Sequence, residues 1–158
     1  ASPICDNLRK ISANALNKLK LNFHSEGTYI CIEGPQFSTL AESNLYRSWG
    51  CDVIGMTNMP ESKLAMEAGI CYVSLSMVTD YDCWHKDHDS VTVDQIVKTM
   101  KKNSENALKF INEICKEKTI KCSEITKNLA KNSVITDKSK IKKKTIDNLS
   151  NILRFNES

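Results

Sequence analysis

The sequence has no long hydrophobic run: no stretch reaches the roughly 18 uninterrupted apolar residues that a membrane-spanning helix requires. Its opening residues, ASPICDNLRK, also lack the basic and then apolar segments of a signal peptide. We therefore expect a cytoplasmic location and no membrane association. With 158 residues, 41% of them hydrophobic and 26% charged, the chain has the composition of a soluble globular domain with one core.

Paired cysteine motifs are absent as well, because none of the seven cysteines forms a CxxC pair. Their odd number and irregular spacing, with Cys31 and Cys71 inside apolar runs, predict reduced and buried thiols. Cys83, His85 and His88 offer sulfur and nitrogen within one loop. Their spacing matches no paired zinc pattern and no fourth ligand is evident, so we expect no metal ion.

The sequence shows no phosphate-cradling glycine loop, no Ser-His-Asp arrangement and no internal repeat. A strong excess of charge is also missing, since the formal net charge is only +3. Much of that excess comes from five lysines near the C-terminus, Lys138, Lys140, Lys142, Lys143 and Lys144. Aromatic residues do not interleave with these lysines, so we expect a solvated surface and no nucleic-acid partner.

What is present is an alternation of helical and β-rich segments. Helical patterns cover residues 6–20, 39–49, 60–68 and about 92–116, and a weaker one covers 141–153. The β-rich runs cover residues 27–34, 51–56 and 70–78, of which the last is nearly free of charge and reads as a strand buried on both faces. Ser38 or Thr39 caps the second helix, Pro60 begins the third and Gly69 ends it. This rhythm predicts an α/β fold with largely parallel strand pairing.

Polar and aromatic residues follow each of the three predicted strands, where ligands bind in α/β sheets. The segments are Gln36-Phe37-Ser38, Met56-Thr57-Asn58 and Thr79-Asp80-Tyr81-Asp82. Together they suit a heteroaromatic ligand attached to a sugar, with a carboxyl group as a general acid. The alternatives are that Asp80 or Asp82 caps a turn, and that Phe37 and Met56 pack in the core.

A stretch of some sixty residues carries specific motifs: EGPxFST, AES, WGxDVIGMT, PE, LAxEAGICY and TDYDCW, in this order. This stretch resembles the central signature of the methylthioadenosine and purine nucleoside phosphorylase family, and weaker similarity reaches back to Ser2 and forward to about Lys116. The resemblance implies the nucleoside phosphorylase fold, an α/β fold with a mixed, largely parallel sheet flanked by helices, over residues 1–116. Residues 117–158 would form a Lys-rich helical segment of the same domain.

In this family, orthophosphate attacks the anomeric carbon of a purine nucleoside and releases the base and a sugar 1-phosphate. The resemblance implies that Asp80 donates to the imidazole ring of the base and that Asp82 helps to bind its 6-amino group, which makes these two the catalytic residues. It also implies that Phe37 packs on the base, that Met56 lies along the ribose, and that Thr57 contacts phosphate or the ribose hydroxyls. Orthophosphate is a co-substrate, and no cofactor is expected.

Three positions bear on the expected substrate. A carboxylate at Asp80, where the 6-oxopurine members carry an amide, favours adenine, and Ser38 stands where those members carry a glutamate. Val93 falls where they place a histidine toward the 5′-hydroxyl, and an apolar Val93, with Ile96 and Val97 one turn on, favours a methylthio group. The resemblance thus implies phosphorolysis of 5′-methylthioadenosine to adenine and 5-methylthioribose 1-phosphate, a step of purine and methionine salvage.

The chain departs from the family in length. Members are roughly twice as long, and their N-terminal half carries a glycine-rich phosphate loop, an Arg-His phosphate clamp and a threonine segment, none of which this sequence contains. We therefore expect the chain to supply the purine- and ribose-binding half, as a homotrimer or paired with a separate N-terminal half. Two alternatives stay open: a non-catalytic fragment that binds adenine nucleosides, and a remnant that only oligomerises.

Overall fold

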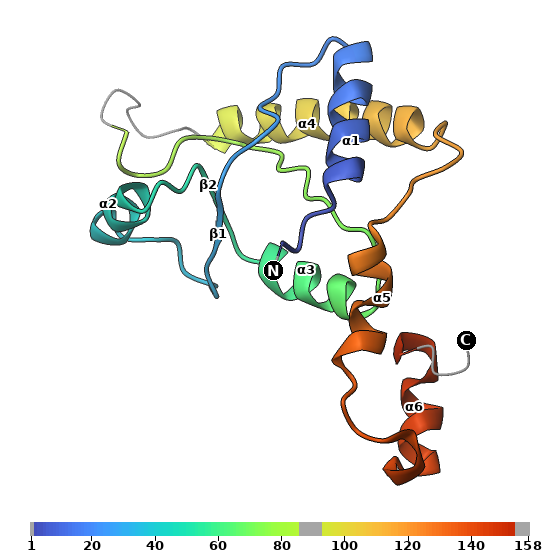
Figure 1. The fold of residues 1–158 in the computed structure, drawn as a ribbon. Helices are drawn as coiled ribbons and strands as arrows, with labels where there is room; N and C mark the ends of the chain where they lie inside the picture. The colour runs from blue at the N-terminus through green and yellow to red at the C-terminus, as the bar shows by residue number, and fades with distance from the viewer. Residues whose placement is uncertain (1, 86–92, 154–158) are drawn as a thin grey trace. The chain divides into compact units, whose positions relative to one another are not determined.

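The computed structural model describes residues 2–85 and 93–153 (Figure 1). The chain divides into two compact units that interleave along the sequence. The first unit comprises Ala1–Arg9, Pro60–Val73 and Ile120–Ser158, and the second comprises Lys10–Met59 and Ser74–Thr119. The predicted division of one domain at residue 116 stays a prediction.

A short parallel sheet lies in the second unit. Strand β1 (Tyr29–Cys31) pairs with β2 (Val53–Gly55), so that Tyr29 faces Val53 and Cys31 faces Gly55. A side chain supports the start of the pair, because the Asp52 carboxylate accepts the Thr28 backbone N–H at 2.7 Å. The predicted α/β class and parallel pairing are confirmed, although both strands are shorter than the β-rich runs that predicted them.

The third predicted strand is wrong: none of residues 70–78 forms a strand. Nor is this segment buried on both faces, since Ile70 is 55% exposed and Val78 is 58% exposed. An apolar run becomes a strand only when a neighbouring strand receives its backbone hydrogen bonds. The pattern within the run cannot supply that neighbour, and among the described residues none pairs with it.

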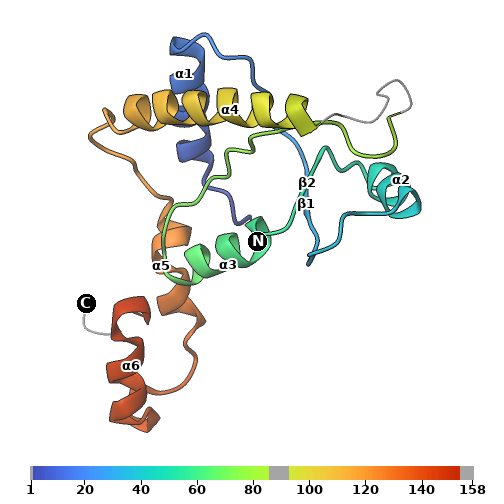
Figure 2. The same ribbon diagram turned by 180° about the vertical axis from the view of Figure 1, so that it is seen from behind.

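The core of the second unit forms where two helices cross. Phe110 of α4 (Val93–Ile114) packs with Ala15 and Leu16 of α1 (Asp6–Lys18), and all three are buried. Figures 1 and 2 view the molecule from opposite sides, and in both views α4 crosses α1. The helical patterns at residues 6–20 and 92–116 are thus confirmed, with slightly shorter bounds. Partly buried side chains complete this cluster: Leu19, Leu21, Phe23, Leu75 and Ile114.

Helix α2 (Leu40–Ser48) also belongs to the second unit, and of the two predicted caps the structure selects Thr39. The Thr39 hydroxyl accepts the Glu42 N–H at 3.3 Å, while the Glu42 carboxylate accepts the Thr39 N–H at 2.7 Å. This reciprocal pair lowers the pKa of Glu42, first through the backbone hydrogen bond and then through the Thr39 hydroxyl. Gly50, at φ +76°, follows the helix in the left-handed conformation that glycine favours.

The first unit contains most of α3 (Asn58–Glu67), then α5 (Glu124–Ser133), a 3₁₀ turn (Lys138–Lys140) and α6 (Lys143–Leu153). Helix α3 begins two residues before Pro60, so the predicted start is wrong, whereas Gly69 at φ +67° confirms its predicted end. Helix α6 confirms the pattern at residues 141–153. Helix α5 was not predicted, because its short apolar stripe lies within a Lys- and Asn-rich segment.

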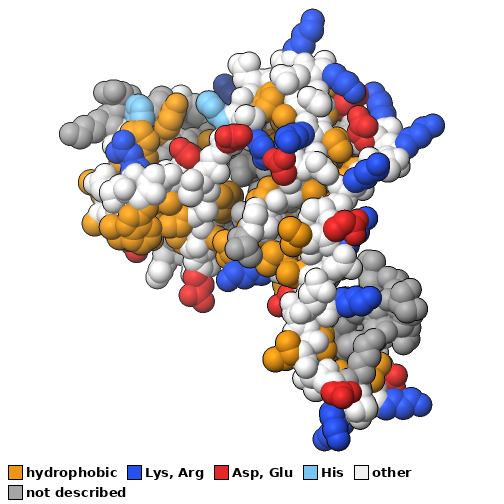
Figure 3. Space-filling model, viewed as in Figure 1, with side chains coloured by type: hydrophobic (Ala, Val, Ile, Leu, Met, Phe, Trp, Pro, Cys, Tyr) orange, Lys and Arg blue, Asp and Glu red, His pale blue; other side chains and the backbone are white. Residues whose placement is uncertain are grey.

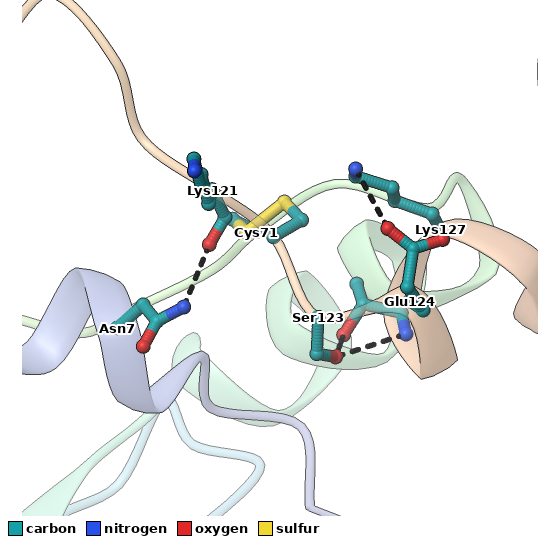
Figure 4. Close-up of a disulfide and its surroundings, with 8 residues drawn as sticks. Asn7, Cys71, Lys121, Ser123, Glu124 and Lys127 are labelled. Carbon is teal, nitrogen blue, oxygen red and sulfur yellow. Dashed lines mark hydrogen bonds and ion pairs between the residues drawn. A yellow bond between two sulfur atoms is a disulfide. The ribbon is translucent and has the colours of Figure 1, made fainter.

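A disulfide joins Cys71 and Cys122 in the first unit (Figure 4). The prediction that all cysteines are reduced is therefore wrong for these two. The pairing depends on the approach of two segments that are 51 residues apart, with their Cα atoms at 5.6 Å, which the spacing of cysteines along the chain does not reveal. The same two segments are also near a third one, since Asn7 Nδ2 donates to the Lys121 carbonyl at 3.0 Å and Cys5 N–H donates to the Tyr72 carbonyl at 2.8 Å.

Large hydrophobic side chains of the second unit are exposed over α2 and α4, and Figure 3 shows such side chains gathered over α2. Trp49 is 62% exposed, and α4 presents Val93, Val97, Met100, Leu108 and Ile111. None of the described helices is long and apolar enough to cross a membrane.

Candidate purine-binding site

The site is built around one contact between α2 and the turn that follows Thr79-Asp80-Tyr81. Ser43 on α2 is 1% exposed, and its hydroxyl donates to Asp82 Oδ2 at 2.6 Å. The other carboxylate oxygen, Oδ1, accepts the Cys83 N–H at 2.8 Å. Asp82 is thus held at both oxygens. The alternative in which Asp82 caps the following turn stays a prediction, because the Cys83 N–H belongs to the adjacent residue and a capping aspartate accepts from the backbone two residues on.

Two further contacts join the same elements. Just before α2, the Ser38 carbonyl accepts the Cys83 thiol at 3.7 Å. One turn beyond Ser43, the Arg47 guanidinium lies over the Trp84 ring, 3.6 Å from its centroid. This is the geometry of a cation–π interaction. Along the loop and α2, Ser38, Ser43 and Arg47 therefore contact the turn residues Cys83, Asp82 and Trp84, respectively.

The end of β2 lies against the loop that follows β1. A Cβ built on Gly34 would lie 2.6 Å from Met56 Sδ, and Gly34 has φ +73°. Glycine meets both demands at once, because it has no side chain to collide with Met56 and it tolerates positive φ. The structure thus brings Met56 to the segment that carries Phe37 and Ser38.

Other predicted site residues are not enclosed by this chain. Phe37 is 89% exposed, and Asp80 and Thr57 are also exposed. On α4, Val93 is 73% exposed and Val97 is 57% exposed. In the described part of the chain, the hydrogen bond recorded for the Asp80 carboxylate comes from the adjacent Thr79 hydroxyl, at 2.8 Å. The alternative in which Phe37 packs in the core is wrong.

A hollow of about 50 Å³ lies beside Ser43, Asp82 and Trp84. Its other lining residues are Ile30, Tyr46, Arg47, Cys51, Asp52, Val53 and Ile54. Small-molecule sites usually hold roughly 300–1,000 Å³, so this hollow cannot accept a nucleoside. Phe37 and Asp80 do not line this hollow.

Sequence reasoning missed Ser43, Arg47 and Trp84. Two signals could have found them: Ser43 and Arg47 are four residues apart and so share one face of a helix, and Trp84 ends the motif TDYDCW. Glu42 serves the cap of α2. Of Cys83, His85 and His88, the last lies outside the described residues, and the described residues contain no group of three potential metal ligands.

A family model and known sequences both relate this chain to phosphorylases. The family model described as "Phosphorylase superfamily" matches residues 1–116. An S-methyl-5′-thioadenosine phosphorylase of Koribacter versatilis is 50% identical over 155 residues, which cover 96% of this chain and 52% of that protein. One of Ciona intestinalis is 46% identical over 138 residues, covering 85% of this chain and 49% of that protein. The chain thus spans about half the length of the curated relatives it matches.

Solved structures agree with this likeness. A methylthioadenosine phosphorylase from an antarctic soil metagenomic library matches with a TM-score of 0.85 at 37% identity, covering 96% of this chain and 54% of that one. A methylthioadenosine phosphorylase from Schistosoma mansoni in complex with adenine matches with a TM-score of 0.72 at 31% identity, covering 84% and 54% of the two chains. The expected nucleoside phosphorylase fold is confirmed.

Proposed function

Because this chain belongs to the phosphorylase superfamily, we propose that it supplies the purine- and ribose-binding half of a 5′-methylthioadenosine phosphorylase. The observation that carries the proposal is the hydrogen-bonded junction of α2 with the turn at Asp82. This junction brings the loop just before α2, which carries Phe37 and Ser38, beside the segment that carries Asp80. A plane for stacking and a carboxyl group are what a purine base needs for recognition.

The proposed reaction is phosphorolysis of 5′-methylthioadenosine, which yields adenine and 5-methylthioribose 1-phosphate. The departing adenine gains electrons as the glycosidic bond breaks, so a donor at its imidazole ring lowers the barrier. We assign that role to Asp80, and we assign the 6-amino group to Asp82. Phe37 stacks on the base, Met56 lies along the ribose, and Thr57 contacts phosphate or the ribose hydroxyls.

The remaining assignments concern selectivity. Ser38 stands where the 6-oxopurine members carry a glutamate, and this difference favours adenine. Val93 and Val97 present apolar surface, which suits a methylthio group better than a 5′-hydroxyl. Both valines are exposed in this chain, so in the working enzyme another surface must cover them together with the substrate.

We propose that this surface comes from the part that corresponds to the N-terminal half of the relatives, whether joined to this chain or separate from it, or from further copies of the chain in a trimer. The relatives extend well beyond the part that this chain matches, and the second unit leaves large apolar side chains uncovered. The phosphate site would also come from the part that corresponds to the N-terminal half of the relatives. A cytoplasmic location stays a prediction.

The test supplies the part of a relative that this chain does not match. The half of the Koribacter versatilis relative that this chain does not match is mixed with the chain, and phosphate-dependent release of adenine from methylthioadenosine is followed. We expect turnover from the mixture, and turnover at least about a hundredfold slower from the chain alone, because positioned groups that bind the attacking anion typically contribute that much or more. Asp80→Asn should lower turnover of methylthioadenosine in the mixture and shift binding toward hypoxanthine.

The matched control is Ser48→Ala, which changes an exposed residue of α2 whose hydroxyl donates within its own helix, to the Leu45 carbonyl. A mixture that folds but binds no adenine would refute the proposal. Adenine binding without turnover would favour the alternative of a non-catalytic binding fragment.

A further inference from the structure

The junction between α2 and the turn at residues 82–84 has one buried polar group at its centre. Ser43 is 1% exposed, and its hydroxyl reaches a charged acceptor, Asp82 Oδ2, at 2.6 Å. A serine hydroxyl on a helix could instead bond to the carbonyl four residues earlier, as that of the exposed Ser104 does with Met100 at 2.9 Å. The Ser43 hydroxyl is therefore used across elements rather than within its own helix.

Helix α2 itself is held in register by its N-terminal cap. Thr39 and Glu42 bond reciprocally just before Ser43, and this fixes where the first turn of the helix begins. Arg47 lies one turn beyond Ser43 and contacts Trp84. Since the helix is anchored on either side of Ser43, its hydroxyl presents a fixed donor to the turn.

Asp82 and Asp80 differ in what holds them. Asp82 is partly buried and accepts hydrogen bonds at both oxygens, from Ser43 and from the Cys83 N–H. Asp80 is exposed, and its carboxylate accepts from Thr79. The two residues are separated only by Tyr81, so a restraint on Asp82 limits the directions that Asp80 can take.

We infer that Ser43 is a positioning residue of the purine site: it fixes the carboxylate of Asp82, and through it the short segment that presents Asp80 to the base. This inference rests on the proposed function, since it assigns Ser43 a part in recognising adenine. Ser43 is 1% exposed and donates to Asp82, so this role requires no contact with the substrate. Its effect on adenine therefore passes through Asp82.

The experiment measures adenine binding to the full chain by equilibrium dialysis. Ser43→Ala removes the donor, and we expect adenine affinity to fall roughly tenfold, the size of effect typical when one hydrogen bond to a charged group is lost. Ser43→Thr keeps the hydroxyl and should restore most of the affinity. The control Ser48→Ala, on the exposed side of the same helix, should leave affinity unchanged.

Coupling to Asp82 separates a positioning role from general stabilisation of the fold. Asp82→Ala removes both acceptor oxygens, whereas Asn would still accept from Ser43. If Ser43 acts through Asp82, the effects of Ser43→Ala and Asp82→Ala on adenine affinity will not add, and the double variant will bind about as well as Asp82→Ala alone. Circular dichroism shows which variants are folded. Should Ser43→Ala unfold, Ser43→Cys replaces it, because a thiol is close in size but a weaker donor, and we then expect an intermediate loss of affinity.

The possible failures are distinguishable. If the unmodified chain binds no adenine, alone or with its complementing half, the proposed function fails and the inference fails with it. If the unmodified chain binds adenine and folded Ser43→Ala binds it equally well, the inference fails alone. Fully additive effects of Ser43→Ala and Asp82→Ala would also overturn it.

Discussion

The disulfide between Cys71 and Cys122 gives the sharpest prediction about stability. Replacing Cys122 with serine opens a loop whose ends are 51 residues apart in sequence. In the chain-entropy model, closing a loop of that length removes about 14 cal/mol/K from the unfolded chain, or ~4 kcal/mol near room temperature. Real unfolded chains are more compact than the model assumes, so we expect Cys122→Ser to lower the free energy of unfolding by about 2–4 kcal/mol.

The measurement is urea unfolding of protein purified without reductant, compared with the same protein after reduction and alkylation. Reduction should destabilise the unmodified chain and leave Cys122→Ser unaffected. The matched control is Cys115→Ser, because Cys115 is free and exposed, and it should change stability little. Thiol counting gives an independent check. Seven alkylated cysteines in unfolded protein that has not been reduced would refute the pairing, whereas five would support it.

Two other predictions concern the second unit. Hydrogen bonds from Thr39 hold the pKa of Glu42 below its ordinary value of 4.5, so Glu42 contributes stability that is present above that value and is lost as the pH falls through the lower pKa of the folded state. Glu42→Gln should therefore be less stable than the unmodified chain at neutral pH, and urea titrations should show the difference shrinking under acid conditions; a constant difference would contradict this. Phe110→Ala removes the centre of the small core and should cost roughly 3–5 kcal/mol, which thermal unfolding can measure. Leu108→Ala is the control on the same helix, since Leu108 is 63% exposed and its loss should cost little.

Local sequence was sufficient to predict where most helices form. Helix α1 follows from the spacing of its apolar residues, and the ends of α2 and α3 follow from Gly50 and Gly69, because helix periodicity and left-handed glycines are properties of a few neighbouring residues. The family followed from motifs that stand in fixed order over some sixty residues, and the comparisons confirm it. The roles of Asp80, Phe37 and Val93 rest on the same motifs and stay predictions.

Tertiary structure decided the features that depend on segments far apart in sequence. The run at residues 70–78 has strand-like composition but no described neighbour to receive its hydrogen bonds, and Cys71 has the surroundings of a buried thiol until Cys122 is brought beside it. Ser43 looks like an ordinary helix residue until Asp82, 39 positions later, accepts its hydroxyl hydrogen. Each of these depends on a partner that chain folding supplies. The sequence alone therefore identified the family of this chain, and the fold determined which of its groups meet.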